Sequence, residues 1–342
     1  MPNGTWAYSY GKSQNVNPNL GWEEKKEWNL GVDYSFFEGR LYGKFDYYRR
    51  EVDNLLFSVK VPQPPYTQGS QMQNIGSMES KGWEFEVGGD IIRTKDFTWS
   101  SSMNLSHNTG KILTLEGDNS YHNGNGFVAP GTPGDAARME AGSTIGSFYM
   151  WKFAGFDDEG SFLLYNKDGE VIPAAQKTEN DKQYIGNYTP KLIIGWSHTL
   201  TYKNFDLGIN LRSWIDFDVY NTINMYYGIQ GQGNLNVLKD AYGKFNHIKG
   251  EKQICDYFLE DGTFLKIDAI TLGYTLPMKM YTNNLIDRIR IYGTVGNVCT
   301  ITGYSGMNPE VDITGWDKGT EKFWSDFYPV VRTWTLGMQF NF

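Results

Sequence analysis

Residues 330–342 have the sequence VVRTWTLGMQFNF, and from Thr333 onward their side chains alternate in character. One set is apolar or aromatic and the other is small or polar: Trp334, Leu336, Met338, Phe340 and Phe342 against Thr333, Thr335, Gly337, Gln339 and Asn341. A period of two residues predicts a β-strand with two different faces. An aromatic last residue is typical of a transmembrane barrel, whose final strand must close the sheet in lipid. A half-buried terminal strand of a soluble β-protein would show the same pattern, so this stretch alone leaves both open.

The composition of the 342-residue chain favours the barrel. Aromatic residues make up 16%, glycine occurs 39 times, charged residues make up 20%, and the mean hydropathy is -0.50. Membrane barrels combine polar loops and water-facing positions with Tyr and Trp at the interfaces. No apolar run approaches the roughly 18 residues of a transmembrane helix. The net charge of -8 argues against a nucleic-acid partner.

The start of the chain has no charged-then-apolar segment of the kind found in signal peptides. The sequence is already strand-like at residues 6–8, Trp-Ala-Tyr. We therefore expect a fragment that begins within a domain.

The cysteines and histidines give no sign of a metal site or a disulfide framework. Cys255 and Cys299 are far apart in sequence, and the four histidines are scattered without ligand spacing. We expect free thiols, although pairing of the two cysteines stays open. No metal and no cofactor are predicted.

The alternation predicts about ten antiparallel strands, at residues 5–11, 28–36, 41–48, 83–88, 97–106, 192–202, 205–211, 264–276, 289–298 and 333–342. The expected connections differ in length. Short turns at 38–39, 93–96 and 203–204 and an intermediate connection at 277–287 alternate with long ones at 60–74, 113–189, 216–261 and 303–329. The second long connection is expected to hold a small hairpin, 153–156 with 162–165. Outer-membrane barrels sort their connections in this way, with short turns in the periplasm and long loops outside. The fold class predicted is an all-β, antiparallel transmembrane β-barrel meander.

Several motifs resemble one family. Residues 74–85, NIGSMESKGWEF, resemble the N-I-G-x-M-x-N-K-G-x-E signature of SusC/RagA-type TonB-dependent transporters of Bacteroidetes. Residues 264–277, FLKIDAITLGYTLP, are similar to the family's F-L-(K/R)-I-x-N-(I/V)-x-L-G-Y-x-(F/L)-P motif, although Ala269 stands where asparagine is usual. Other matches occur in the family's order, at residues 17–23, 96–100, 145–149 and 334–342.

The resemblance implies an outer-membrane importer of oligosaccharides or peptides. Its members carry a plug in a barrel of about 22 strands, are energised by the TonB complex, and pair with a SusD-like surface lipoprotein. On this basis residues 1–342 are the C-terminal part of such a barrel, without the plug and the first half. The expected partners are the SusD-like lipoprotein, the TonB complex through the missing N-terminal part, the nutrient and outer-membrane lipid. An isolated fragment is expected to be non-functional, because its open edges would lie unpaired in lipid.

No catalytic pattern stands out. The acidic clusters at residues 157–159 and 168–170 could supply paired carboxylates for glycoside hydrolysis. Gly160 and Gly169 suit tight turns instead, and solvated turns are the commoner role of such clusters. We therefore expect no enzyme activity.

Aromatic residues in the expected loops are candidates for ligand contact, because sugar rings stack on aromatic faces. The set is Tyr66, Tyr121, Phe127, Tyr149, Trp151, Tyr226, Tyr227, Trp316 and Trp324. We choose Tyr226 and Tyr227, in a loop rich in Gly, Asn and Gln, together with Tyr121 and Trp316. The alternative role of these residues is packing within loops or at the membrane interface.

Two other functions remain open. A surface β-sheet module could capture glycans through its loop aromatics without transport, and a barrel could carry an enzyme. Dependence on detergent would separate an importer from the first of these, and a catalytic constellation would support the second.

Overall fold

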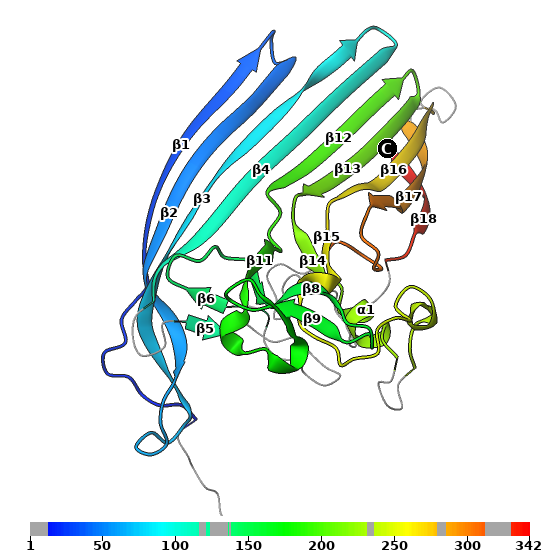
Figure 1. Cartoon of the computed structure of the whole chain (residues 1–342). Helices are drawn as coiled ribbons and strands as arrows, with labels where there is room; N and C mark the ends of the chain where they lie inside the picture. The colour runs from blue at the N-terminus through cyan, green and yellow to red at the C-terminus, as the bar shows by residue number, and fades with distance from the viewer. Residues whose placement is uncertain are drawn as a thin grey trace, which may run out of the picture.

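The computed structural model describes residues 13–115, 121–123, 136, 138–230, 236–278, 285–311 and 330–342. Their main feature is a nine-stranded sheet in which every strand is antiparallel to its neighbours. In order, its strands are β1 (Glu24–Phe36), β2 (Leu41–Lys60), β3 (Ser70–Arg93), β4 (Phe97–Leu115), β12 (Leu192–Tyr202), β13 (Phe205–Ile215), β16 (Phe264–Pro277), β17 (Arg288–Thr302) and β18 (Thr333–Asn341). Figure 1 shows them side by side as a curved wall. The sheet is an antiparallel meander, as predicted, and within the described residues its edge strands β1 and β18 are not paired to each other, so the barrel is partial rather than closed.

The expected strand at residues 5–11 lies outside the described residues, and the other nine are present. The expectation for residues 60–74 was wrong in part. Strands β2 and β3 have 20 and 24 residues, and their connection is only 61–69. Register shifts near Leu55, beside Asn54 at φ 58°, break the period-two pattern there. Beyond these shifts the apolar and polar side chains no longer alternate in the sequence, although β2 and β3 continue as strands.

The two faces of the sheet differ in chemistry. Directly paired residues of an antiparallel sheet share one face. One cross-strand row is Val32, Phe45, Phe85, Leu105 and Ile194. The adjacent row is Asp33, Lys44, Glu86, Asn104 and Gly195. The apolar face exposes large side chains, including Leu336 at 82% and Leu30 at 66%. Such a large exposed apolar surface indicates contact with lipid, and the polar face lines the inside of the curve.

Aromatic rings mark both edges of the apolar band. At one end Trp28 lies 5.5 Å from Tyr47 between ring centroids, and at the other end Phe205 lies 4.6 Å from Tyr274. Along β4 the band runs from Phe97 to His107, roughly 34 Å of strand. A tilt of about 40° reduces this to about 26 Å, the height of a barrel's lipid belt. No helix in the described part of the chain is long and apolar enough to cross a bilayer.

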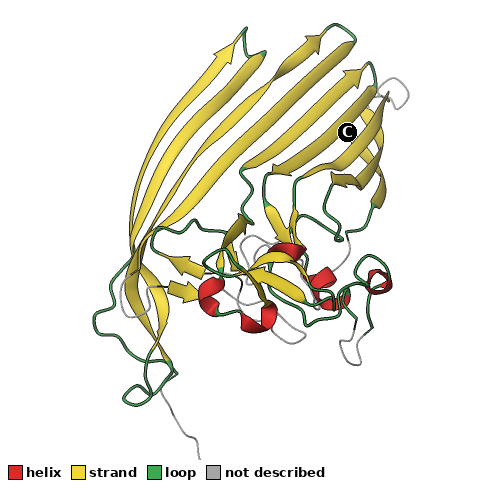
Figure 2. Cartoon of the chain, in the orientation of Figure 1, coloured by secondary structure: helices red, strands yellow, loops and turns green. Residues whose placement is uncertain are grey.

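The β4–β12 and β13–β16 connections fold together into a compact unit, here called the loop module. It contains β5 (Tyr121–Asn123), β6 (Arg138–Glu140), β7 (Ser147–Met150), β8 (Lys152–Phe156), β9 (Phe162–Tyr165), β10 (Val171–Pro173), β11 (Gln183–Asn187), β14 (Asp218–Tyr220), β15 (Leu259–Asp261), α1 (Thr222–Tyr227) and the 3-10 helices η1 (Ala174–Gln176), η2 (Glu179–Asp181), η3 (Lys239–Tyr242) and η4 (Asp256–Phe258). Figure 2 shows the helices gathered in this unit, at one end of the wall. The predicted hairpin is confirmed, because β8 pairs with β9.

The loop module has its own apolar core. Fully buried side chains from both connections meet there, among them Met150, Leu164, Tyr220, Met225 and Ile248. Backbone contacts join the connections, since the Trp151 amide donates to the Ile254 carbonyl at 3.3 Å and Phe153 to the Asp256 carboxylate at 2.6 Å. Cys255 lies buried at this junction, while Cys299 is exposed on β17, and both thiols are free as expected. The described parts of these two connections are therefore packed structure rather than loose loops.

Candidate functional site: the inner wall and the loop module

Four charged side chains form a cluster on the inner face, where β13 and β16 approach the loop module. The Arg212 Nε lies 2.9 Å from a carboxylate oxygen of Asp268, and the Arg212 Nη1 lies 2.5 Å from one of Glu310. The Lys266 ammonium lies 3.2 Å from Glu310 and 3.8 Å from Asp268. A bulge between Ile267 and Ala269 makes Asp268 an extra residue of β16 in its pairing with β13. The Lys266 side chain is only 4% exposed, and these carboxylates are its ion-pair partners.

A second ion pair lies on the inner face near the short-turn end. Arg290 donates from Nε and Nη2 to the two carboxylate oxygens of Asp206, at 2.9 and 2.5 Å, a two-point contact. The guanidinium also lies 4.9 Å from the centre of the Tyr292 ring. A Cβ at Gly273 would lie 2.5 Å from Asp206 Oδ1, so the pair occupies the space that a larger residue would need. In both of these clusters the charges on the inner wall are paired locally.

The segment that follows β17 is bound to the loop module. The Glu260 carboxylate accepts from the Ser305 amide at 2.8 Å and from the Ser305 hydroxyl at 2.7 Å. It also accepts from the Asn221 side chain at 2.9 Å. Together with the Glu310 contacts, these bonds connect residues 303–311 to both the module and the wall.

The structure corrects one of the four predicted ligand residues. Tyr226, on helix α1, is fully buried in the module core and has no surface to offer a ligand. Burial raises the pKa of Tyr226 to about 12. Tyr227 is half-buried and packs against the same core. Tyr121 lies in β5, its side chain is outside the described residues, and so is the whole of Trp316. Ligand contact by Tyr227, Tyr121 or Trp316 stays a prediction.

Trp151, another aromatic from the expected loops, also serves packing. Its side chain is 5% exposed, and its indole N–H donates to the Thr178 carbonyl at 2.8 Å. The ammonium of Lys182 lies 4.4 Å from the ring centre. The alternative role stated above, packing within loops, is therefore correct for Trp151 and Tyr226.

Tyr226 offers a direct test of packing against ligand contact. We expect Tyr226→Ala to lower the stability of the loop module by about 3–5 kcal/mol, because it leaves a large cavity in the core. Tyr226→Phe keeps the ring and is expected to leave the fold and any ligand affinity nearly unchanged. Hydrogen exchange of residues 217–259 measures the first effect. A strong loss of ligand affinity in Tyr226→Phe, with unchanged exchange, would contradict the packing role.

The acidic clusters are turns. The Asp157 carboxylate accepts from the amides of Glu159 at 3.0 Å and Ser161 at 2.7 Å. The Asn166 side chain accepts from the amides of Asp168 and Glu170 in the same way. Within the described residues, no group of three or more potential ligands could hold a metal ion. The turn interpretation is the one that the geometry favours.

Comparison with known proteins agrees with this architecture. The family model for the TonB dependent receptor-like beta-barrel matches residues 1–298. The chain belongs to this family. It is therefore an outer-membrane β-barrel chain, which explains the exposed apolar face of the sheet.

The relatives of this TonB-dependent receptor chain come from Bacteroidetes. It is 31% identical to the TonB-dependent receptor SusC of Bacteroides thetaiotaomicron, over 100% of this chain and 34% of SusC. It is 30% identical to the TonB-dependent receptor P3 of Formosa agariphila, over 96% of this chain and 35% of that protein. The chain thus spans about a third of the length of the curated relatives it matches.

Two solved structures share the fold of this TonB-dependent receptor chain. The RagAB peptide transporter covers 97% of this chain with a TM-score of 0.76 and 25% identity. The RagAB peptide importer in its open-open state covers 98% with a TM-score of 0.78 and 25% identity. The chain corresponds to 38% and 37% of those chains.

A polar hollow in the loop module of this TonB-dependent receptor chain was not expected from the sequence. Its volume is about 560 Å³, and its lining is Lys152, Tyr165, Asn166, Lys167, Gly169, Asp181, Lys182 and Gln183. The Lys152 ammonium lies 5.6 Å from the centre of the Tyr165 ring. An aromatic ring among polar groups suits a sugar or a peptide side chain. The lining residues are up to 31 positions apart in the sequence, and no local pattern connects them.

Asp181 holds one side of this hollow in place. Its carboxylate accepts from the hydroxyl and the amide of Thr178, both at 2.7 Å, and from the Lys167 amide at 3.0 Å. The Thr178 hydroxyl and the Lys167 amide hold the pKa of Asp181 below its usual value. A lowered folded-state pKa means that this stabilisation is present above the ordinary pKa of about 3.9 and is lost as the pH falls through the lower, folded value.

We expect Asp181→Ala to loosen residues 166–182 at neutral pH, at a cost of about 1–3 kcal/mol for the unpaired donors. Faster hydrogen exchange in this segment would show it. Asp168→Ala is a matched control, because Asp168 is exposed in the neighbouring turn. Equal exchange in both variants would show that the Asp181 contacts do not stabilise the hollow.

Proposed function

We propose that residues 1–342 form the C-terminal part of the barrel of a TonB-dependent importer, which moves a nutrient across the outer membrane. The observation that carries the proposal is a single curved sheet with an apolar outer face, a polar inner face, and a folded loop module at one end. An importer needs lipid on one side of its wall and a polar path on the other. The exposed apolar face argues against the alternative function, a water-soluble module that binds glycans without transport.

The proposed cargo is an oligosaccharide or a peptide. The structural relatives are described as a peptide transporter and a peptide importer, which favours a peptide. The polar hollow beside Tyr165 supports either cargo. The other proposed partners are a SusD-like surface lipoprotein at the loop module, and the TonB complex acting through parts of the protein outside this chain. We propose no catalytic step, and the relatives are named as receptors rather than enzymes.

The test is growth of a strain that lacks the gene on a panel of single oligosaccharides and peptides as nutrients. Loss of growth on one nutrient is expected, with recovery when the complete gene is restored. Inactivation of TonB in the restored strain is expected to abolish growth on that nutrient again. Recovery that does not need TonB would contradict energised import. Residues 1–342 alone are expected not to restore growth, because the edges at β1 and β18 would be unpaired.

A further inference from the structure

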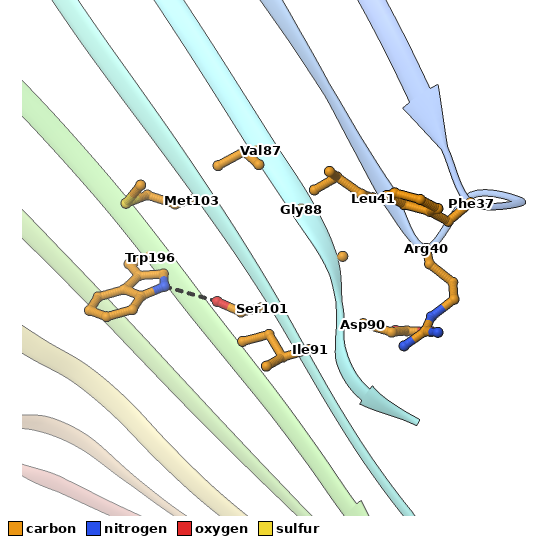
Figure 3. A pocket seen from close by; sticks show the side chains of 11 residues that line it. Phe37, Arg40, Leu41, Val87, Gly88, Asp90, Ile91, Ser101, Met103 and Trp196 are labelled. Atoms are coloured by element: carbon orange, nitrogen blue, oxygen red, sulfur yellow. Dashed lines mark hydrogen bonds between the residues drawn. The ribbon is translucent and has the colours of Figure 1, made fainter. Parts of the chain in front are cut away.

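The lipid-facing side of the sheet has a hollow of about 560 Å³ at the short-turn end, between β2, β3, β4 and β12. Figure 3 shows its walls, made by Leu41, Val87, Ile91, Met103 and Trp196. Three of these, Val87, Met103 and Trp196, form one directly paired row. This row belongs to the apolar face, so the hollow opens toward lipid and not toward the inner path.

The backbone creates the hollow. A Cβ at Gly89 would lie 2.2 Å from the Arg40 carbonyl oxygen, so glycine is required where β3 passes this turn. The register then shifts between Asp90 and Ile92. The extra residue, Ile91, stands out from the sheet at 52% exposure and forms a wall. Gly89 has no side chain and the neighbouring Ile91 projects from the sheet, so a depression forms between them and the surrounding surface.

The polar groups in the hollow already have partners within the protein. The Trp196 indole N–H donates to the Ser101 hydroxyl at 2.9 Å, as the dashed line in Figure 3 shows. The Asp90 carboxylate belongs to the polar inner face, as Glu86 does, where it accepts from the Ser100 hydroxyl at 2.7 Å and lies 3.4 Å from the Arg93 guanidinium. Since these groups are satisfied, a hydrocarbon chain can cover the floor without a desolvation penalty.

One positive charge lies at the rim. Arg40 ends the β1–β2 turn, and Figure 3 shows its guanidinium at the edge of the hollow. The Asp90 carboxylate lies on the polar inner face and pairs with Arg93, and no carboxylate of the described residues forms an ion pair with Arg40. The neighbouring Phe37 is 74% exposed, as interfacial aromatics are. Short turns of such barrels face the periplasm, so Arg40 lies at the level of lipid headgroups of the inner leaflet.

We propose that this hollow binds one phospholipid molecule of the periplasmic leaflet. One acyl chain lies over Gly89 and Ser101 between Val87 and Trp196, and the phosphate pairs with Arg40. An arginine fork matches phosphate oxygens in two-point contact, and the apolar walls match the chain. The site rests on the family assignment only for the direction of the membrane, and does not depend on which nutrient is imported.

The test measures lipid retained by the complete protein purified from outer membranes. The wild type is expected to keep about one phospholipid per molecule after exhaustive exchange into mild detergent, as counted by native mass spectrometry and lipid extraction. Arg40→Gln removes the phosphate partner, and Val87→Trp fills the hollow with a side chain that lipid tolerates. Both are expected to lower the retained phospholipid at least tenfold. Adding palmitoyl-oleoyl phosphatidylethanolamine back is not expected to restore the retained phospholipid in either variant.

Lys203→Gln is the matched control, because Lys203 is a cation in the β12–β13 turn at the same end and does not line the hollow. It is expected to retain lipid as the wild type does. Equal retention in all four proteins would overturn the proposal, as would a retained lipopolysaccharide, which belongs to the other leaflet, or detergent only. Arg40→Gln changes an exposed turn residue, so it keeps the test decisive even if Val87→Trp folds poorly. Nutrient uptake, measured alongside, reports on the proposed function separately.

Discussion

Glu310→Ala is expected to destabilise the folded barrel by about 3 kcal/mol, near the lower end of the range for a buried charge left without its partner. Glu310 is the nearest carboxylate to the Lys266 ammonium, at 3.2 Å, and Lys266 is only 4% exposed. Asp268 remains at 3.8 Å and Glu310 itself is 20% exposed, which limits the loss. Urea unfolding of the complete protein in lipid vesicles, followed by tryptophan fluorescence, gives the free energy of unfolding.

The double variant Glu310→Ala with Lys266→Met distinguishes two causes of instability. One is the buried charge of Lys266 left without its partner, and the other is the loss of the contacts that residues 303–311 make through Glu310. Removing both charges is expected to recover most of the stability, because no uncompensated ammonium stays buried and Arg212 keeps Asp268. Glu38→Ala, at an exposed turn position, is the control and is expected to change stability by less than about 0.5 kcal/mol. If the double variant is as unstable as Glu310→Ala, the contacts of residues 303–311 matter and the charge on Lys266 does not.

The strands of the sheet could be predicted because the pattern that identifies each one lies within its own stretch of sequence. In the stretches from Trp28 to Phe36 and from Phe97 to Ser106, each residue faces either lipid or the interior, so the sequence alternates with the pleat. The motif at residues 264–277 coincides with β16, and Pro277 ends that strand as expected. The prediction failed where this alternation is interrupted, at the bulge beside Asn54. Strands β2 and β3 are therefore longer than the predicted strands at residues 41–48 and 83–88.

The candidate site could be predicted much less well, because it depends on contacts between distant residues. The core around Tyr226 joins residues from the β4–β12 connection to others about a hundred positions later, such as Trp151 to Cys255. An aromatic residue in a Gly-rich stretch looks the same whether it packs inside a module or faces a ligand. The cluster of Lys266 with Glu310 also crosses a connection, and nothing in the sequence near either residue indicates its partner.

Ile209→Arg is expected to destabilise the barrel by about 2–4 kcal/mol, the cost of an arginine near the middle of the bilayer. Ile209 lies halfway along β13, in a row with His198 and Ile270 on the lipid-facing side. The guanidinium would have to reach an interface about 10 Å away or bring water into the bilayer. The measurement is the fraction of protein that reaches the outer membrane in folded form, seen as a heat-dependent shift on gels, with urea unfolding in vesicles for the free energy.

Gly208→Arg, one position earlier on the same strand, isolates the effect of the face. A side chain at Gly208 meets no atom within 4 Å of its Cβ, and this position faces the polar interior. The same added charge is therefore expected to cost less than about 1 kcal/mol there. We expect a large difference between two adjacent positions to come mainly from the face that each one occupies, since strand, depth and the introduced side chain are shared. If Gly208→Arg proves the more harmful, the two faces have been assigned the wrong way round, and the inner wall and the lipid site would exchange places.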